Sequence, residues 1–297
     1  MQPRVTASLV PAGIRLGDTA VLGGTVSPAY LGSSVLVRRR MADGSWVAVG
    51  TAPVSSTGTY RWAVRPGLIG SYSFMAVLPA HPAHLAATSP VRTLQVDPRD
   101  LRRGDSGGDV TTLERRLAAQ KLDVGAIDGS FDYNLQHAVI AFQKSQGLPR
   151  TAVYDEATRA RLGAPLHVTL RYPATGRAVE IDLRKQVLYL SFAGVLQRVV
   201  DVSTGSGGLY YQDGRWQRAT TPTGRFAITW KINDPNHVSP LGVLYRPAFF
   251  YGGYAVHGSS SVPTYPASHG CVRVTTHVQD GLYSLLTVGT PVSVYAS

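Results

Sequence analysis

The chain has 297 residues, a formal net charge of +11, 16% charged residues, 31 glycines and 19 prolines. This length accommodates two or three domains, each with its own core, and the glycine and proline content favours short strands joined by turns over long helices. The positive charge is spread along the chain, whereas a nucleic-acid binder usually gathers its charge on one face. Diffuse charge would equally serve an exported protein that acts on an anionic polymer of a cell envelope, so charge alone leaves this choice open and the motifs have to decide it.

Residues 1–97 have the pattern of an all-β domain. Turns rich in Gly, Pro, Ser and Asp-Gly separate seven short apolar runs, and this spacing predicts a small β-sandwich. The runs are Val5–Val10, Ala20–Val26, Val35–Val37, Trp46–Val49, Tyr60–Val64, Tyr72–Val77 and Val91–Val96. The string Gly70–Phe74 resembles the tyrosine corner of immunoglobulin-like domains, with Tyr72 as its tyrosine. We therefore expect an Ig-like β-sandwich that acts as a spacer, with Trp46 in its core.

Residues 98–163 change to helical periodicity and predict a small three-helix domain. Asp109 is a candidate N-cap for a first helix, and Asn134 for a second that ends at Gly147. Asp155 is the candidate N-cap of a short third helix.

Several strings in this segment are similar to the small three-helix peptidoglycan-binding domain. They are Leu101–Val110, Leu113, Asp128–Phe131, Ala138–Val139 and Phe142–Gln143. Asp132 and Leu135 stand where that family usually has Gly and Thr. The resemblance implies contact with peptidoglycan, and a spacer kept for its packing is the alternative.

Residues 164–297 return to β-type runs and predict a C-terminal β-rich domain. The runs are Val179–Leu183, Gln186–Ser191, Gln197–Val202 and Arg225–Ile232. The whole chain is therefore expected to be a mainly β, multidomain protein.

The last domain contains Cys271, which is the single cysteine of the chain. One cysteine excludes an internal disulfide, and a lone thiol in an exported protein is either intermolecular or reactive. A thiol becomes a good nucleophile beside a proton acceptor, and two histidines compete for that role. His269 would share a face with Cys271 on an extended backbone, whereas His257 comes from a separate segment and would need tertiary packing to reach the sulfur.

The surroundings of the cysteine suggest how a reacting carbonyl would be held. No Asp or Glu lies between residues 235 and 279, so we expect a backbone carbonyl to orient the histidine. The N–H groups of Gly270 and Cys271 are candidate donors to an oxyanion. A tyrosine hydroxyl could assist them, and the candidates Tyr245, Tyr251 and Tyr254 stay open.

Further residues near the motif have two interpretations each. Arg273 would bind a substrate carboxylate or form a structural ion pair, and Ser268 is expected in a turn. The aromatic segment Asn233–Tyr254 and the segment Gly205–Thr221 are expected to form walls or lids over the site.

Residues 165–296 resemble the L,D-transpeptidase catalytic domain. The strings that carry this resemblance are Glu180–Leu183 with Gln186–Tyr189, Val202–Gly205, Thr221–Phe226, His257-Gly258 and Ser268-His-Gly-Cys-Val-Arg273. The resemblance implies a β-sandwich-like fold, Cys271 as nucleophile and His257 as base. With the base assigned to His257, we expect His269 to order the turn through hydrogen bonds, and Gly258 and Ser268 to be further orienting groups. Peptidoglycan stem peptides are the implied substrate, joined by 3-3 cross-links through a cysteine thioester, without a cofactor or metal. Acylation of Cys271 by a carbapenem is also implied.

Three rival interpretations remain. An L,D-carboxypeptidase would pass the same acyl group to water, and a non-catalytic wall-binding protein would not react at all. A zinc site would use Cys271, His269 and His257 with His277 or His237, although this spacing matches no common zinc pattern.

The location expected for the protein is outside the cytoplasm, in the bacterial cell envelope or wall. No uncharged stretch reaches the roughly 18–20 residues that span a bilayer. The chain does not begin with a basic and then apolar leader, so we expect a leader or anchor to be absent from it.

Overall fold

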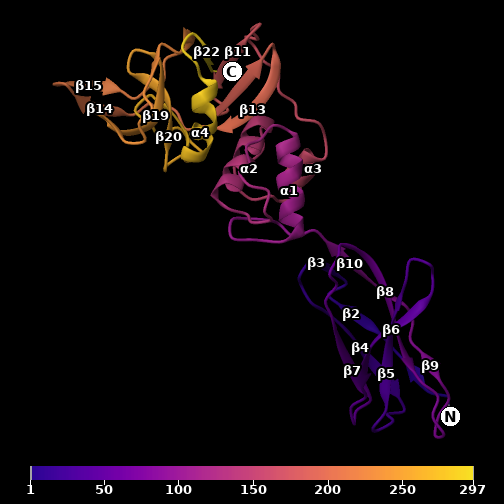
Figure 1. Ribbon diagram of the computed structural model, residues 1–297. Helices are drawn as coiled ribbons and strands as arrows, with labels where there is room; N and C mark the ends of the chain where they lie inside the picture. Colours follow the sequence, from indigo (N-terminus) through magenta and orange to yellow (C-terminus); the bar gives the residue numbers. More distant parts are fainter. Residues whose placement is uncertain (1, 297) are drawn as a thin grey trace. The chain divides into compact units, whose positions relative to one another are not determined.

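The computed structural model describes residues 2–296, and the chain divides into two compact units, Met1–Arg99 and Asp100–Ser297. Both units consist mainly of strands, which confirms the expected fold class (Figure 1). Within residues 2–296, no helix has both the length and the apolarity needed to cross a membrane.

The first unit is a sandwich of two sheets. One sheet has the strand order β1-β4-β2 with β7 beside β4, and the other has the order β3-β10-β8-β5-β6 with β9 beside β8. The strands are β1 (Arg4–Val5), β2 (Ser8–Val10), β3 (Gly13–Arg15), β4 (Ala20–Ser27), β5 (Ser34–Arg40), β6 (Trp46–Pro53), β7 (Thr59–Val64), β8 (Gly70–Leu78), β9 (Ala87–Thr88) and β10 (Arg92–Asp97).

Two local features of this sandwich were predicted from the sequence and can be compared with the structure. The Tyr72 hydroxyl donates to the Leu68 carbonyl at 2.7 Å, which confirms the tyrosine corner. The assignment of Trp46 to the core was wrong: Trp46 is only half-buried, and Trp62 instead packs against both core clusters of the sandwich. Trp46 and Trp62 each lie in a short apolar run, so the sequence pattern alone could not tell which of the two is in the core.

The second unit begins with three helices, α1 (Gly108–Ala119), α2 (Tyr133–Gln146) and α3 (Glu156–Leu162). Asp155 caps α3 by accepting the Thr158 N–H at 2.8 Å, as predicted. The cap of α2 is Asp132, two residues before the expected Asn134, and it accepts the Leu135 N–H. Helix α1 has no side-chain cap, because Asp109 lies inside its first turn.

Two larger sheets and a hairpin follow. The first sheet has the order β13-β12-β11-β22-β16, the second has the order β17-β19-β20-β21 with β18 beside β19, and β14 pairs only with β15. The strands are β11 (Arg177–Asp182), β12 (Val187–Phe192), β13 (Val195–Asp201), β14 (Leu209–Gln212), β15 (Arg215–Arg218), β16 (Gly224–Ala227), β17 (Trp230–Lys231), β18 (His237–Ser239), β19 (Gly242–Tyr251), β20 (Tyr254–Ser259), β21 (Val272–Thr275) and β22 (Pro291–Tyr295).

A fourth helix, α4 (Thr276–Leu285), follows β21 directly and packs on β19 and β20. This helix was not predicted from the sequence. Its signals are the Thr275 hydroxyl, which accepts the Val278 N–H, and the spacing of buried Val278 and Leu282 on one face.

The sheet that contains β12 and β13 is buried on both faces. Val187, Tyr189 and Val199 belong to a core cluster formed with the three helices. Their neighbours Leu188 and Val200 belong to the cluster between the two sheets. Since successive strand residues point to opposite faces, the helices cover the face that the second sheet does not reach (Figure 1).

This shared core bears on the domain boundaries. Residues 98–163 and 164–297 were expected as separate domains, whereas contact within the chain groups Asp100–Ser297 into one unit. A division into three domains, with boundaries at 97 and 163, stays a prediction.

A core substitution in α2 tests how tightly the helices and the sheet are linked. Phe142 is fully buried in the cluster that joins them, so Phe142→Ala should lower the free energy of unfolding by about 3–5 kcal/mol. We expect the helices and the β12–β13 region to unfold in one transition, measured by chemical denaturation with hydrogen exchange. Phe74→Ala, in the first unit, is the control and should leave that transition in place. Unfolding of the helices in a transition separate from that of the β12–β13 region would contradict a shared core.

Candidate active site

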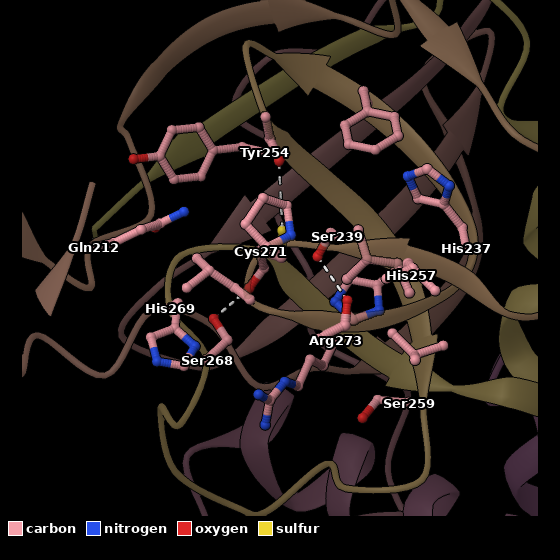
Figure 2. Close-up of a pocket in the computed structure, with 18 of the residues that line it drawn as sticks. Gln212, His237, Ser239, Tyr254, His257, Ser259, Ser268, His269, Cys271 and Arg273 are labelled. Carbon is pink, nitrogen blue, oxygen red and sulfur yellow. Dashed lines mark hydrogen bonds between the residues drawn. The ribbon is translucent and has the colours of Figure 1, made fainter. Parts of the chain in front are cut away.

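A cavity of about 630 Å³ opens in the second unit. Its lining contains Cys271 and His257 together with Tyr254, Ser268 and Arg273 (Figure 2). Figure 2 shows Cys271 in the middle of this group. Cys271 and His257, which are fourteen positions apart in the sequence, therefore line the same cavity.

Parallel pairing of β20 with β21 brings these two residues together. His257 is the register partner of Arg273, and Val256 is the partner of Val272. Extending this register by one residue sets Cys271 beside Ala255, on the same face as His257. Strand spacing and rise then give a separation of about 8 Å between the Cα atoms of Cys271 and His257, which side chains can bridge.

The ring of His257 is oriented by a backbone carbonyl, as expected. Its Nδ1 lies 2.8 Å from the carbonyl oxygen of Gly258. A carbonyl oxygen only accepts hydrogen bonds, so Nδ1 carries the proton in the neutral ring and Nε2 is left as the acceptor. Gly258 has no room for a side chain, because a Cβ there would lie 2.7 Å from the Tyr245 ring.

Burial keeps His257 neutral. The side chain is 4% exposed, and its desolvation lowers the pKa of His257 to about 4, against the opposing effect of the bond to Gly258. The nearby Arg273 charge lowers the pKa further. At neutral pH the ring is therefore a proton acceptor.

Cys271 is partly exposed to the cavity, and its thiol is protonated at neutral pH. Burial of the sulfur raises the pKa of Cys271, and the Ala255 N–H and the Arg273 charge only partly offset this. The Sγ atom lies 3.7 Å from the Gly253 carbonyl oxygen, and a thiol donates such a bond. The site thus holds a neutral thiol and a neutral imidazole.

The turn before the cysteine is tied by Ser268. The Ser268 hydroxyl donates to the Cys271 carbonyl at 2.6 Å and accepts the Gly270 N–H at 3.0 Å. This corrects one expectation: the Gly270 N–H is engaged within the turn, so it is not a free oxyanion donor here. Gly270 itself has φ +142, and a Cβ there would lie 2.5 Å from the Tyr254 ring.

His269 does not order this turn through hydrogen bonds, contrary to expectation. Its side chain is exposed, and its ring has no hydrogen-bond partner among residues 2–296. It lies edge-on to the Tyr210 ring, with 4.8 Å between centroids. The left-handed backbone at Gly270 breaks the extended geometry that would have set His269 beside the sulfur.

Of the three candidate tyrosines, Tyr254 alone lines the cavity. Its pKa is raised by burial and by the neighbouring Tyr210 and Cys271. Tyr245 is removed from the candidates because its hydroxyl donates to Asp280 at 2.7 Å. Tyr251 is exposed and does not line the cavity; its ring stacks on that of Tyr254, with 6.2 Å between centroids, and is tilted against that of Phe226.

Arg273 lines the cavity on the same face as His257. Its backbone pairs with Ser203 through two hydrogen bonds of 3.0 Å, which fixes where the side chain starts. Among residues 2–296 no carboxylate lies within ion-pair distance of its guanidinium, so the structural ion pair considered from the sequence is not formed.

Both segments expected as walls contribute to the cavity. The hairpin β18–β19 supplies His237, Ser239 and Leu241, and the hairpin β14–β15 supplies Tyr210 and Gln212. The segments were predicted from the sequence, but their lining residues were not. Strand alternation, with Tyr210 and Gln212 on one face of β14, is the signal that would have found two of them.

Thr221 was also missed. Its hydroxyl donates to the Gly270 carbonyl at 2.6 Å and accepts the Gly205 N–H at 2.9 Å. It therefore holds the cysteine turn against the strand segment that follows β13.

The side chains named for a zinc site do not converge. His277 Nε2 lies 3.3 Å from Asp123, and His269 packs on Tyr210. In the described part of the chain, no three His, Cys, Asp or Glu residues are grouped so that they could hold a metal.

Comparisons with known proteins agree with this geometry. Residues 176–294 match the model of the L,D-transpeptidase catalytic domain, and residues 106–162 match that of a putative peptidoglycan binding domain. A crystal structure of the L,D-transpeptidase (residues 123-326) from Xylanimonas cellulosilytica DSM 15894 is 43% identical, with a TM-score of 0.64. That match covers 67% of this chain and 98% of the other.

A second structure, an L,D-transpeptidase (Yku) from Stackebrandtia nassauensis, is 25% identical with a TM-score of 0.41. It covers 66% of this chain and 95% of that one. No curated protein matches the sequence.

The low pKa of His257 predicts how stability depends on pH. The unfolded chain, with a His pKa near 6.5, binds this proton between pH 6.5 and about 4, whereas the folded protein does not. Stability should therefore fall as pH drops through this window, by up to about 3 kcal/mol from His257. His257→Gln should show a shallower fall in unfolding free energy between pH 7 and 4. Parallel curves for the two proteins would mean that His257 is not desolvated.

Proposed function

Because the chain belongs to the L,D-transpeptidase family, we propose that Cys271 is its nucleophile and His257 its general base. The observation that supports this proposal is the shared cavity, whose lining contains both a neutral imidazole and the single thiol of the chain. The substrate proposed is a peptidoglycan stem tetrapeptide, and the product is a 3-3 cross-link.

The reaction runs through a thioester. The sulfur of Cys271 attacks the carbonyl carbon of the third stem residue, while His257 Nε2 takes the thiol proton. The tetrahedral intermediate collapses, its C–N bond breaks, and the imidazolium returns the proton to the leaving nitrogen, which departs with D-alanine. The amine of a neighbouring stem then attacks the thioester, loses a proton to His257, and restores the thiol when the C–S bond breaks.

The neutral thiol of Cys271 and the neutral imidazole of His257 fit these reaction steps. Neither the protonated thiol nor the unprotonated imidazole is charged before substrate binds, so charge develops only as the carbonyl is attacked. The Cys271 N–H and the Tyr254 hydroxyl are the proposed donors to the oxyanion. A donor of this kind contributes about 3–4 kcal/mol to transition-state stabilisation.

Arg273 is proposed to bind a carboxylate of the stem peptide. A guanidinium without an acidic partner among residues 2–296, in the lining of the cavity and on the residue that pairs with His257 in the strand register, supports this role. The hairpins β14–β15 and β18–β19 are proposed to cover the bound peptide. Covering would favour transfer to an amine over hydrolysis, since both depend on which nucleophile reaches the thioester.

These assignments imply a protein that works at the cell wall. The match of residues 106–162 to a peptidoglycan-binding model supports that location, and export across the membrane is part of the same proposal.

Intact-mass spectrometry tests the nucleophile. After incubation with a tetrapeptide stem, the protein should gain the mass of the tripeptide acyl group, and a carbapenem should likewise add its mass. Cys271→Ala should show neither adduct, while His257→Gln should retain the thiol and acylate at least about 100-fold more slowly. An adduct that persists in Cys271→Ala would refute the assignment. Dimer and tripeptide products, separated by chromatography, then report transfer against hydrolysis.

Substitution of Arg273 tests the carboxylate site. A charge-assisted hydrogen bond contributes about 1.5–3 kcal/mol, so Arg273→Ala should lower kcat/KM for stem peptide about 10- to 100-fold. Arg273→Lys keeps the charge that acts on the thiol and imidazole and should lose less. Amidation of the substrate carboxylate should abolish the difference between wild type and Arg273→Ala. If amidated and free substrates respond equally to the substitution, Arg273 does not bind the carboxylate.

A further inference from the structure

The helical segment 101–162 touches the catalytic elements through polar contacts as well as through the shared apolar core. We propose that this segment is a positioning element of the active site, which holds the loop between His257 and Cys271 in place. The proposal rests on the proposed function, and it assigns the helices a role in the reaction that is separate from any binding to the wall.

The first contact is a buried cluster between α2 and the end of β13. Lys144 Nζ donates to a carboxylate oxygen of Asp201 and, at 2.8 Å, to the Val202 carbonyl. His137 Nδ1 lies 2.6 Å from the other oxygen of Asp201. All three side chains are buried, so the loss of one partner would leave an uncompensated group in the interior.

This cluster leads directly to the cysteine turn. Ser203 lies two residues after Asp201 and forms the paired backbone bonds with Arg273. The Ser203 hydroxyl donates to the Tyr265 carbonyl at 2.8 Å, and the Thr204 carbonyl accepts the Ser268 N–H at 2.9 Å. The segment that α2 holds at Asp201 is therefore the one against which the turn is built.

The second contact is made by Arg150, which follows α2. Its guanidinium donates to the Thr264 carbonyl at 2.7 Å. It also donates to the carbonyls of Arg184 at 2.9 Å and Lys185 at 3.1 Å, in the turn between β11 and β12. Arg150 thus ties the helical segment, the first sheet and the loop before Cys271 together.

A third contact comes from the start of α2, where the Tyr133 hydroxyl donates to the Ser260 carbonyl at 3.4 Å. Residues 260–271 lie between β20 and β21 and form no strand or helix. A loop without its own ladder of backbone bonds is placed by what its carbonyls meet. Two of the loop's carbonyls, those of Ser260 and Thr264, meet donors of the helical segment.

Substitution of Arg150 in the full chain tests this role. Arg150→Ala removes three hydrogen bonds at the edge of the site without touching the cavity lining. We expect kcat for a soluble tetrapeptide stem to fall about 10- to 100-fold with little change in KM, because small displacements of reacting groups have effects of this size. A soluble substrate excludes any effect of wall binding. Arg150→Lys, which keeps one donor for Thr264, should recover part of the loss.

The matched control is Arg115→Ala, an exposed arginine on α1 that should leave kcat unchanged. Tyr133→Phe is a second, milder variant that removes a single donor and should lower kcat severalfold. The rate of alkylation of Cys271 by iodoacetamide supplies a readout without substrate, and it should change in Arg150→Ala but not in Arg115→Ala. Thermal unfolding of each variant identifies a general loss of fold.

Two results overturn the inference. One is an Arg150→Ala protein that matches Arg115→Ala in both kcat and alkylation rate. The other is a loss of activity that follows the melting temperature alone and is not recovered by Arg150→Lys. If the wild-type protein forms no acyl adduct, the proposed function fails. The alkylation comparison then still decides whether the helices position the thiol.

Discussion

The site depends on one backbone arrangement, the parallel pairing of β20 with β21. Strand β20 carries His257, and β21 begins one residue after Cys271, so their register sets the imidazole and the sulfur on the same face. Parallel neighbours require a connection that leaves one end of the pair and returns at the other, and here this connection is the irregular loop 260–271. The same loop therefore carries the cysteine and has to be held by other parts of the chain.

Desolvation gives this arrangement its chemistry. Desolvation of the two side chains lowers the pKa of His257 to about 4 and raises the pKa of the Cys271 thiol. An ion pair is thereby disfavoured before substrate binds. The Gly258 carbonyl replaces the carboxylate that many catalytic histidines use as an orienting partner, and it adds no charge that would raise the basicity of the ring further.

Much of the fold followed from the sequence, because strand spacing, the tyrosine corner and the Asp155 cap are local signals. The identities of Cys271 and His257 as candidates followed from a single thiol near two histidines. What the sequence did not reveal depends on tertiary contacts. Tyr245 is removed from the oxyanion candidates because its hydroxyl bonds to Asp280, on α4, which leaves Tyr254. The surroundings of His269 are likewise set by contact with the Tyr210 ring. The sequence indicated a β-type run over Gln186–Ser191, but only packing identified the helices as the cover of β12.

The solitary sulfur has a practical consequence. Any reagent that reacts with thiols can modify only this position within the chain, and the modified atom lies between two hairpins. A reversible fluorophore on Cys271 would therefore report whether β14–β15 and β18–β19 move, without a background from other sites. The absence of any second thiol in the chain allows such movements to be followed one molecule at a time.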